Sequence, residues 1–182
     1  LFGELKAQWG SLDFLVHSIA YSDKDELKGR FVDTTGANFL NTMQISCFSF
    51  TDMARRAQPL MADAGGSLIT MTYLGAERVI PAYNVMGVAK AALETSVKYL
   101  AADLGPDGIR VNAVCPGYIR TPMIEQGILS DPVAEGRVVS RHPMNRLGTP
   151  EEIAETVVWL CSDAASFVTG HAMAVDGGYV AW

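Results

Sequence analysis

Short apolar runs alternate with longer stretches of helical periodicity along this chain. The runs have the length and composition of buried strands, and they are DFLVHSIA (13–20), SLITMT (67–72), IRVNAVCPG (109–117) and HAMAVDGG (171–178). The helical stretches are expected at 1–10, 38–58, 81–105 and 150–162. Strands that alternate with helices build βαβ units. The sequence therefore predicts an α/β fold of the Rossmann type, a doubly wound parallel sheet with helices on both faces.

Local signals mark where the helical stretches begin and end. Apolar residues recur at every third or fourth position from 39 to 57, which predicts one continuous helix closed by Pro59 and by a turn at 64–66. Pro81 is expected to open the next helix, which ends at Gly105. The sequence Thr-Pro-Glu-Glu at 149–152 is a capping box with proline at the first helical position.

The segment 118–148 is rich in glycine, proline and charge, and it is predicted to be irregular. It is too long for a simple connection, and loops of this kind are often lids. We therefore expect one partial domain over 1–182, with a substrate-binding lid at 121–148.

Charge and cysteine content exclude several classes of function. The chain has 182 residues and a net charge of −6, with no clustered basic stripe, which argues against a nucleic-acid partner. No apolar run approaches twenty residues, so no membrane span is expected. The three cysteines are widely spaced and do not form a metal-binding or redox pattern. They predict buried free thiols in a reducing cytoplasm, and no metal site.

Tyr73, Tyr83 and Lys90 are the candidate catalytic residues. If a helix opens at Pro81, Tyr83 and Lys90 are two turns apart and project from one face. Tyr73 follows the preceding strand and would meet that face. A phenol beside a fixed cation can donate a hydrogen bond or a proton to a developing oxyanion.

Other candidate residues follow the predicted strands. In an open parallel sheet, ligands bind beyond the carboxyl ends of the strands. The segments Ser18-Ile19-Ala20 and Cys115-Pro116-Gly117 lie at two such ends, and Tyr73 lies at a third. We expect all three to converge on one crevice.

Three stretches carry a family resemblance, namely LDFLVHSIA, SLITMTYLGAERVIPAYNVMGVAKAALE and VKYLAADLGPDGIRVNA. From about Leu12 to Asn112 the chain resembles the bacterial enoyl-acyl-carrier-protein reductases of the FabI type, within the short-chain dehydrogenase/reductase superfamily. Most members of that superfamily carry Tyr-x3-Lys, with a serine thirteen residues before the tyrosine. Here Met86 stands four residues before Lys90, and Tyr73 stands thirteen before Met86. The ketoreductase tyrosine is absent and a tyrosine one turn earlier replaces it, which favours an enoyl reductase.

The resemblance implies reduction of a trans-2-enoyl thioester, carried by acyl carrier protein, with NADH in fatty-acid biosynthesis. By this resemblance Tyr83 would hydrogen-bond the enolate oxygen, Lys90 would hold the nicotinamide ribose, and Tyr73 would line the acyl pocket. The implied cofactor neighbours are Ser18, Ile19, Ile119 and Thr121. The implied substrate neighbours are Ser22 and Met123, beside Tyr73. The family also implies a homotetramer in the cytoplasm.

Two stretches depart from the resemblance. AVCPGYIRTPM stands where these reductases usually have Ser-Ala-Gly-Pro-Ile, and the residues after 140 have the style of the wider superfamily. No Gly-x3-Gly-x-Gly turn for a pyrophosphate is found, and the chain is expected to open partway along a helix, after the first strands of the family. NADPH is not excluded as the cofactor, because the family distinguishes NADH from NADPH at the end of its second strand, which is expected to precede Leu1. Two alternatives stay open: a divergent dehydrogenase acting on another enoyl thioester or a carbonyl, and an inactive truncated chain that acts by co-assembly.

Overall fold

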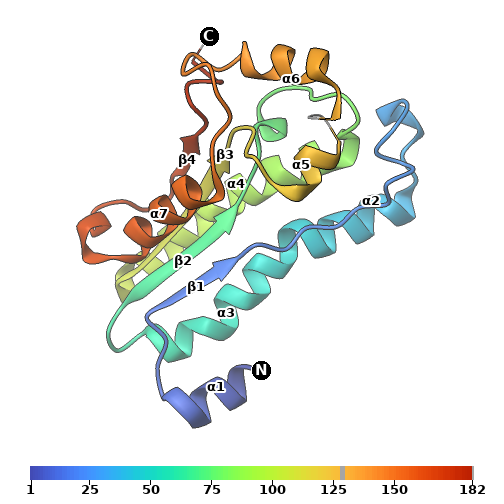
Figure 1. Ribbon diagram of the computed structural model, residues 1–182. Coiled ribbons are helices and arrows are strands. Elements are labelled where there is room, and N and C mark those ends of the chain that lie inside the picture. Colours follow the sequence, from blue (N-terminus) through green and yellow to red (C-terminus); the bar gives the residue numbers. More distant parts are fainter. Residues whose placement is uncertain (128–129, 182) are drawn as a thin grey trace.

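A parallel sheet of four strands forms the centre of the computed structural model, which describes residues 1–127 and 130–181 (Figure 1). The strands lie in the order β1 (Phe14–His17), β2 (Gly66–Met71), β3 (Ile109–Pro116) and β4 (Ala172–Val175). All three pairings are parallel. The α/β prediction is confirmed, although β1 and β4 are each shorter than the apolar run that predicted them.

Helices cover both faces of this sheet (Figure 1). The α3 (Ser49–Met61) and α4 (Asn84–Leu104) helices pack on one face and α7 (Pro150–Cys161) packs on the other. The remaining helices are α1 (Phe2–Trp9), α2 (Gly36–Met43), α5 (Pro122–Gln126) and α6 (Pro132–Val139). Neighbouring strand residues point to opposite faces, so Leu68 packs in a core with α3 and α4 while Ile69 packs with α7. Among the described residues, no helix is both long and apolar enough to cross a membrane.

The predicted continuous helix from 38 is interrupted by a π-helical turn at Gln44–Phe48, between α2 and α3. This turn adds a residue to the helical register, so the buried side chains before it are Asn38 and Thr42 rather than the apolar residues at 39 and 43. The end of the helix was also predicted too early. Pro59 lies inside α3, which continues to Met61.

The segment 118–148 also differs from the prediction. Residues 118–148 are not irregular throughout, since α5 and α6 form within them. Each of these helices begins with proline at its first turn and a side-chain cap, from Thr121 and Asp131 respectively. Ile128 and Leu129, which belong to the predicted lid, lie outside the described residues.

The capping box at 149–152 is confirmed, because the side chains of Thr149 and Glu152 each bond the other residue's backbone N–H.

His17 is a buried polar link between β1, β2 and α3. Its Nδ1 lies 2.9 Å from Thr70 Oγ1 and its Nε2 lies 2.8 Å from Ser49 Oγ. Burial, and then the charge of Lys90, lower the pKa of His17 from 6.5 to about 4.

This burial predicts an acid-sensitive fold. In the unfolded chain the His17 side chain binds a proton at about pH 6.5, whereas in the folded chain it binds one only at about pH 4. The free energy of unfolding is therefore highest above pH 6.5. It decreases as the pH falls toward 4, by up to about 3 kcal/mol from this residue. Urea unfolding between pH 7 and 4 measures it. His17→Gln is expected to be less stable at pH 7 but to lose much less of its remaining stability with acid.

The exposed His171 provides the matched control. His171→Gln is expected to keep the full acid dependence of the parent. An unchanged acid dependence in His17→Gln would contradict the assignment.

Candidate active site

Tyr73 and Tyr83 face each other beyond the carboxyl end of β2. Tyr73 follows two residues after this strand, and Tyr83 is the residue immediately before α4. Their ring centroids are 5.0 Å apart and the ring planes lie at 64°, an edge-to-face contact that fixes both rings. The contact between the two candidate phenols is thus direct.

Tyr83 lies in a turn and not on the helix, so the prediction that Pro81 opens the helix was wrong by three residues. Two neighbours of Tyr83 explain this. Ala82 and Asn84, the first residue of α4, have φ values of +56° and +34°, so the regular right-handed helical backbone cannot continue back through them to Pro81. The Asn84 side chain holds the turn in place, since its Nδ2 donates to the carbonyl of Glu26 at 3.1 Å. The position of Tyr83 therefore depends on the loop before α2 as well as on α4.

Two glycines bring the Tyr73 loop against α4 beside the Tyr83 ring. A Cβ on Gly87 would lie 2.7 Å from the carbonyl oxygen of Gly75. A Cβ on Gly75 would meet the Tyr83 ring, at 2.6 Å from Cε1. Both distances are below any normal contact, so only glycine permits this packing.

Lys90 is a buried residue of α4. Its Nζ donates to the carbonyl of Met71 at 2.7 Å, at the end of β2. One turn further along α4, Glu94 accepts a hydrogen bond of 2.6 Å from the Thr72 hydroxyl. These two bonds clamp the strand end that leads into Tyr73.

Burial shifts the pKa of each of these groups toward its neutral form. The pKa of Lys90 falls to about 8, although Cys47, Cys115 and Glu94 act in the opposite direction. Burial raises the pKa of Tyr83 well above its ordinary value, with Cys115 as a smaller cause. Burial also raises the pKa of Tyr73, followed by hydrogen bonding to Tyr118. Both phenols are therefore protonated, and able to donate, throughout the physiological pH range.

A cavity of about 530 Å³ opens beside the two rings. It is bordered by five predicted site residues, namely Tyr73, Tyr83, Ile119, Thr121 and Met123. The other lining residues are mostly apolar: Pro81, Ala82, Gly117, Tyr118 and Ile124. The expected convergence of the β2 and β3 ends is confirmed, because Tyr73 and Gly117 border the same space.

Other predicted site residues lie outside this lining. Ser18 and Ile19 are exposed beyond the end of β1, and Lys90 is buried with its Nζ at the carbonyl of Met71. Ser22 is buried, and its hydroxyl accepts a 2.9 Å hydrogen bond from Thr42. The structure thus gives Ser22 a place in a polar network with α2, and its role as a substrate neighbour stays a prediction.

Sequence reasoning missed Tyr118, which borders the cavity and acts on the Tyr73 hydroxyl. The available signal was its position directly after the predicted strand 109–117, at a strand end where ligands bind. Met86, in the position of the absent ketoreductase tyrosine, is buried, with its sulfur accepting a hydrogen bond of 3.6 Å from the Ser46 hydroxyl.

Known proteins resemble this chain closely. The protein-family model described as enoyl-(acyl carrier protein) reductase matches residues 1–180. Enoyl-[acyl-carrier-protein] reductase [NADH] 1 of Rhizobium meliloti is 49% identical over 184 residues, which cover 98% of this chain and 65% of the relative. The FabI reductase of Rickettsia bellii is also 49% identical, over 98% of this chain and 68% of its own length.

Solved structures agree with these relatives. The reductase of Anaplasma phagocytophilum, crystallised with NAD, superposes with a TM-score of 0.89 at 47% identity and covers 100% of this chain and 68% of its own. FabI of Candidatus Liberibacter asiaticus gives a TM-score of 0.92 at 44% identity, over 100% of this chain and 70% of its own. The chain thus spans about two thirds of the length of the proteins it matches. It belongs to the enoyl-(acyl carrier protein) reductase family.

Proposed function

We propose that this protein reduces the carbon–carbon double bond of a trans-2-enoyl thioester on acyl carrier protein, with NADH, in fatty-acid synthesis. Its family and the names of its relatives support this reaction. The observation that carries it is the edge-to-face pair of Tyr73 and Tyr83 at a mostly apolar cavity, with the buried Lys90 bonded to the strand end that leads into Tyr73. Such a cavity suits an acyl chain, and its protonated phenols suit an oxygen that gains negative charge.

Tyr83 is proposed as the donor to that oxygen. When bound, NADH supplies the hydride that reduces the β-carbon of the thioester. The thioester oxygen then carries enolate charge, and the Tyr83 hydroxyl donates its hydrogen bond to it. This bond strengthens as the charge develops, so it lowers the barrier rather than merely binding substrate. The raised pKa of Tyr83 keeps the donor protonated at neutral pH.

Lys90 is proposed to hold the ribose of the cofactor. An ammonium group has three N–H donors, and within the described residues one of them is used, by the carbonyl of Met71. Because Lys90 is buried at a strand end, its remaining donors suit the hydroxyls of a sugar bound there. The residues present therefore fit the nicotinamide half of NADH. Ser18, Ile19, Ile119 and Thr121 are proposed as its further neighbours, and Met123 and Ser22 as neighbours of the substrate.

The lowered pKa of Lys90 predicts a loss of activity in alkali. Lys90 is charged below about pH 8 and becomes neutral as the pH rises through that value. If the charge is required, kcat/KM for NADH falls about tenfold per pH unit above 8. Initial rates between pH 6 and 10 measure this, with ionic strength held constant.

Lys90→Arg is the control for the alkaline profile. Because arginine stays charged throughout this range, the variant enzyme is expected to show no alkaline decline. Its activity at pH 7 is expected to be lower than that of the parent, because a planar guanidinium does not have the shape of an ammonium group. A parent profile that stays flat to pH 9.5, or a Lys90→Arg profile with the same decline, would contradict the role of this charge.

The proposed function is tested by following NADH consumption with crotonyl thioester. Two proteins are compared: the 182-residue chain, and the same chain joined to the part of the Rhizobium meliloti reductase that lies outside the match. Reduction of crotonyl thioester by the joined protein supports the proposal. Reduction of a β-ketoacyl thioester, with crotonyl thioester untouched, would refute it. A homotetrameric assembly and a cytoplasmic location stay predictions, and light scattering of the joined protein tests the first.

A further inference from the structure

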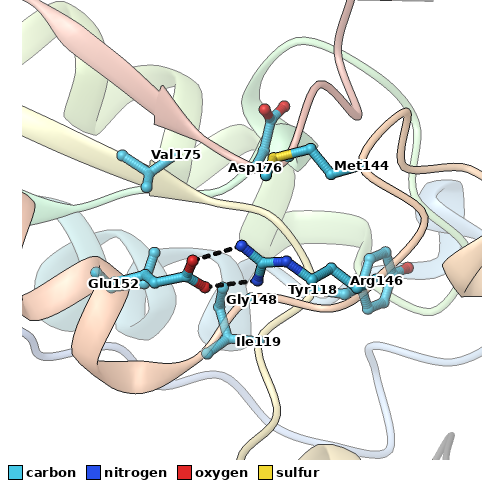
Figure 2. Close-up of a pocket in the computed structure, with 10 residues that line it drawn as sticks. Tyr118, Ile119, Met144, Arg146, Gly148, Glu152, Val175 and Asp176 are labelled. Carbon is cyan, nitrogen blue, oxygen red and sulfur yellow. Dashed lines mark hydrogen bonds and ion pairs between the residues drawn. The ribbon is translucent and has the colours of Figure 1, made fainter.

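Tyr118 borders three cavities. It borders the 530 Å³ cavity with Tyr73 and Tyr83, and also a second cavity of about 120 Å³ and a small space of about 10 Å³ next to Tyr73. Tyr118 and Ile119 both border the two larger cavities, so these two residues lie between them. The 120 Å³ cavity is drawn in Figure 2, which shows Tyr118 beside it, behind the side chain of Arg146.

The Tyr118 residue is held firmly at this position. Its ring contacts those of His142 and Tyr179, with centroids 5.9 Å and 5.6 Å away. Its backbone N–H donates to His142 Nε2 at 3.4 Å, and its carbonyl accepts from the N–H of Gly148 at 3.0 Å. Rotation of the ring out of the cavity would break the aromatic contacts, so Tyr118 is a fixed wall.

The space beyond Tyr118 suits hydrocarbon. Apolar side chains from several segments line it: Ile119, Met144, Ile153 and Val175. Asp176 also borders it, and the two carboxylate oxygens of Asp176 accept hydrogen bonds from the backbone N–H groups of Gly178 and Val180. The cation at its edge, Arg146, is bound by both carboxylate oxygens of Glu152, at 2.6 and 2.8 Å (Figure 2). Since this pair is internally neutralised, the cavity has no free positive charge directed at an anionic ligand.

We propose that Tyr118 limits the length of the acyl chain that the enzyme accepts, by closing the Tyr73–Tyr83 cavity against the apolar cavity beyond it. This inference rests on the proposed function, because it assigns the part of the 530 Å³ cavity next to Tyr73, Tyr83 and Met123 to the acyl group, and the part next to Ile119 and Thr121 to the cofactor. The Tyr118 hydroxyl has a second effect, since it hydrogen-bonds Tyr73. Replacement by phenylalanine and by alanine separates the two effects: both remove the hydroxyl, and only alanine removes the wall.

The test measures kcat/KM for enoyl thioesters of four, eight and twelve carbons, with the joined protein described above. Each methylene newly accommodated in an apolar pocket is worth about tenfold. The ratio of the twelve-carbon to the four-carbon value is therefore expected to rise at least tenfold in Tyr118→Ala and to stay within threefold of the parent in Tyr118→Phe. Tyr179→Phe is the matched control, because Tyr179 packs on Tyr118 but does not border the large cavity.

Binding of saturated acyl thioesters of the same lengths, followed by calorimetry, gives a second readout that needs no reaction. If the parent reduces no thioester while Tyr118→Ala still shifts binding toward longer chains, the proposed function is refuted but the role of Tyr118 in limiting chain length is supported. If the parent does reduce enoyl thioesters and a folded Tyr118→Ala keeps the parent's ratio of twelve-carbon to four-carbon kcat/KM, the proposed role of Tyr118 in limiting chain length is refuted. Thermal melting establishes folding, and Tyr118→Leu takes the place of the alanine variant if that melts below the assay temperature.

Discussion

Replacement of Tyr83 by phenylalanine is expected to lower kcat for enoyl reduction by about 10²- to 10³-fold, the usual cost of removing one donor to a developing oxyanion. The ring of the variant still fits between Tyr73 and Gly75, because only the hydroxyl is lost. We therefore expect the affinity for NADH and the melting temperature to change little. Steady-state kinetics with crotonyl thioester, together with titration of NADH fluorescence, measure both quantities.

The exposed Tyr99 on the same helix supplies the control for this variant. Tyr99→Phe removes a tyrosine hydroxyl from α4 at a distance from the cavity and is expected to leave kcat unchanged. A decrease of less than threefold in Tyr83→Phe would show that another group stabilises the enolate. A decrease in NADH affinity that accounts for the whole loss would give Tyr83 a binding role instead.

Much of the architecture was predictable because each strand and helix carries its own local pattern. The alternation of apolar runs with helical periodicity predicted the parallel sheet, and the capping box at 149–152 predicted the start of α7. The errors fell where tertiary contacts override such patterns. The π turn at 44–48 shifts which side chains are buried, and the apolar spacing alone gives no sign of that shift.

The candidate site was predictable in its members but not in its geometry. The strand-end rule brought Tyr73 to the crevice, and the family resemblance identified Tyr83 and Lys90. The arrangement of Tyr83 depends on positive φ values at Ala82 and Asn84. Residues other than glycine adopt these values only where surrounding contacts hold them, here the bond from Asn84 to a loop 58 positions earlier. A local pattern cannot encode such a tether.

Gly75→Ala is expected to impair the enzyme about as strongly as loss of the Tyr83 hydroxyl, although Gly75 has no functional group. Its new methyl would overlap the Tyr83 ring, near Cδ1 and at 2.6 Å from Cε1. The backbone of Gly75 cannot retreat toward the helix, because its carbonyl already lies against Gly87 of α4. The ring must therefore move. A displacement of about 1 Å from a productive geometry can cost about 10²-fold in rate.

The double variant Gly75→Ala/Tyr83→Phe tests whether the methyl acts through Tyr83. If it does, the alanine costs about 10²-fold in kcat in the parent and little in the Tyr83→Phe background, because the hydroxyl it would misplace is already gone. Gly3→Ala in α1 is the matched control, since its Cβ would meet nothing within 4 Å and alanine favours a helix. Equal fold losses in the two backgrounds would mean that the methyl disturbs the site by another route, such as separating the Tyr73 loop from α4.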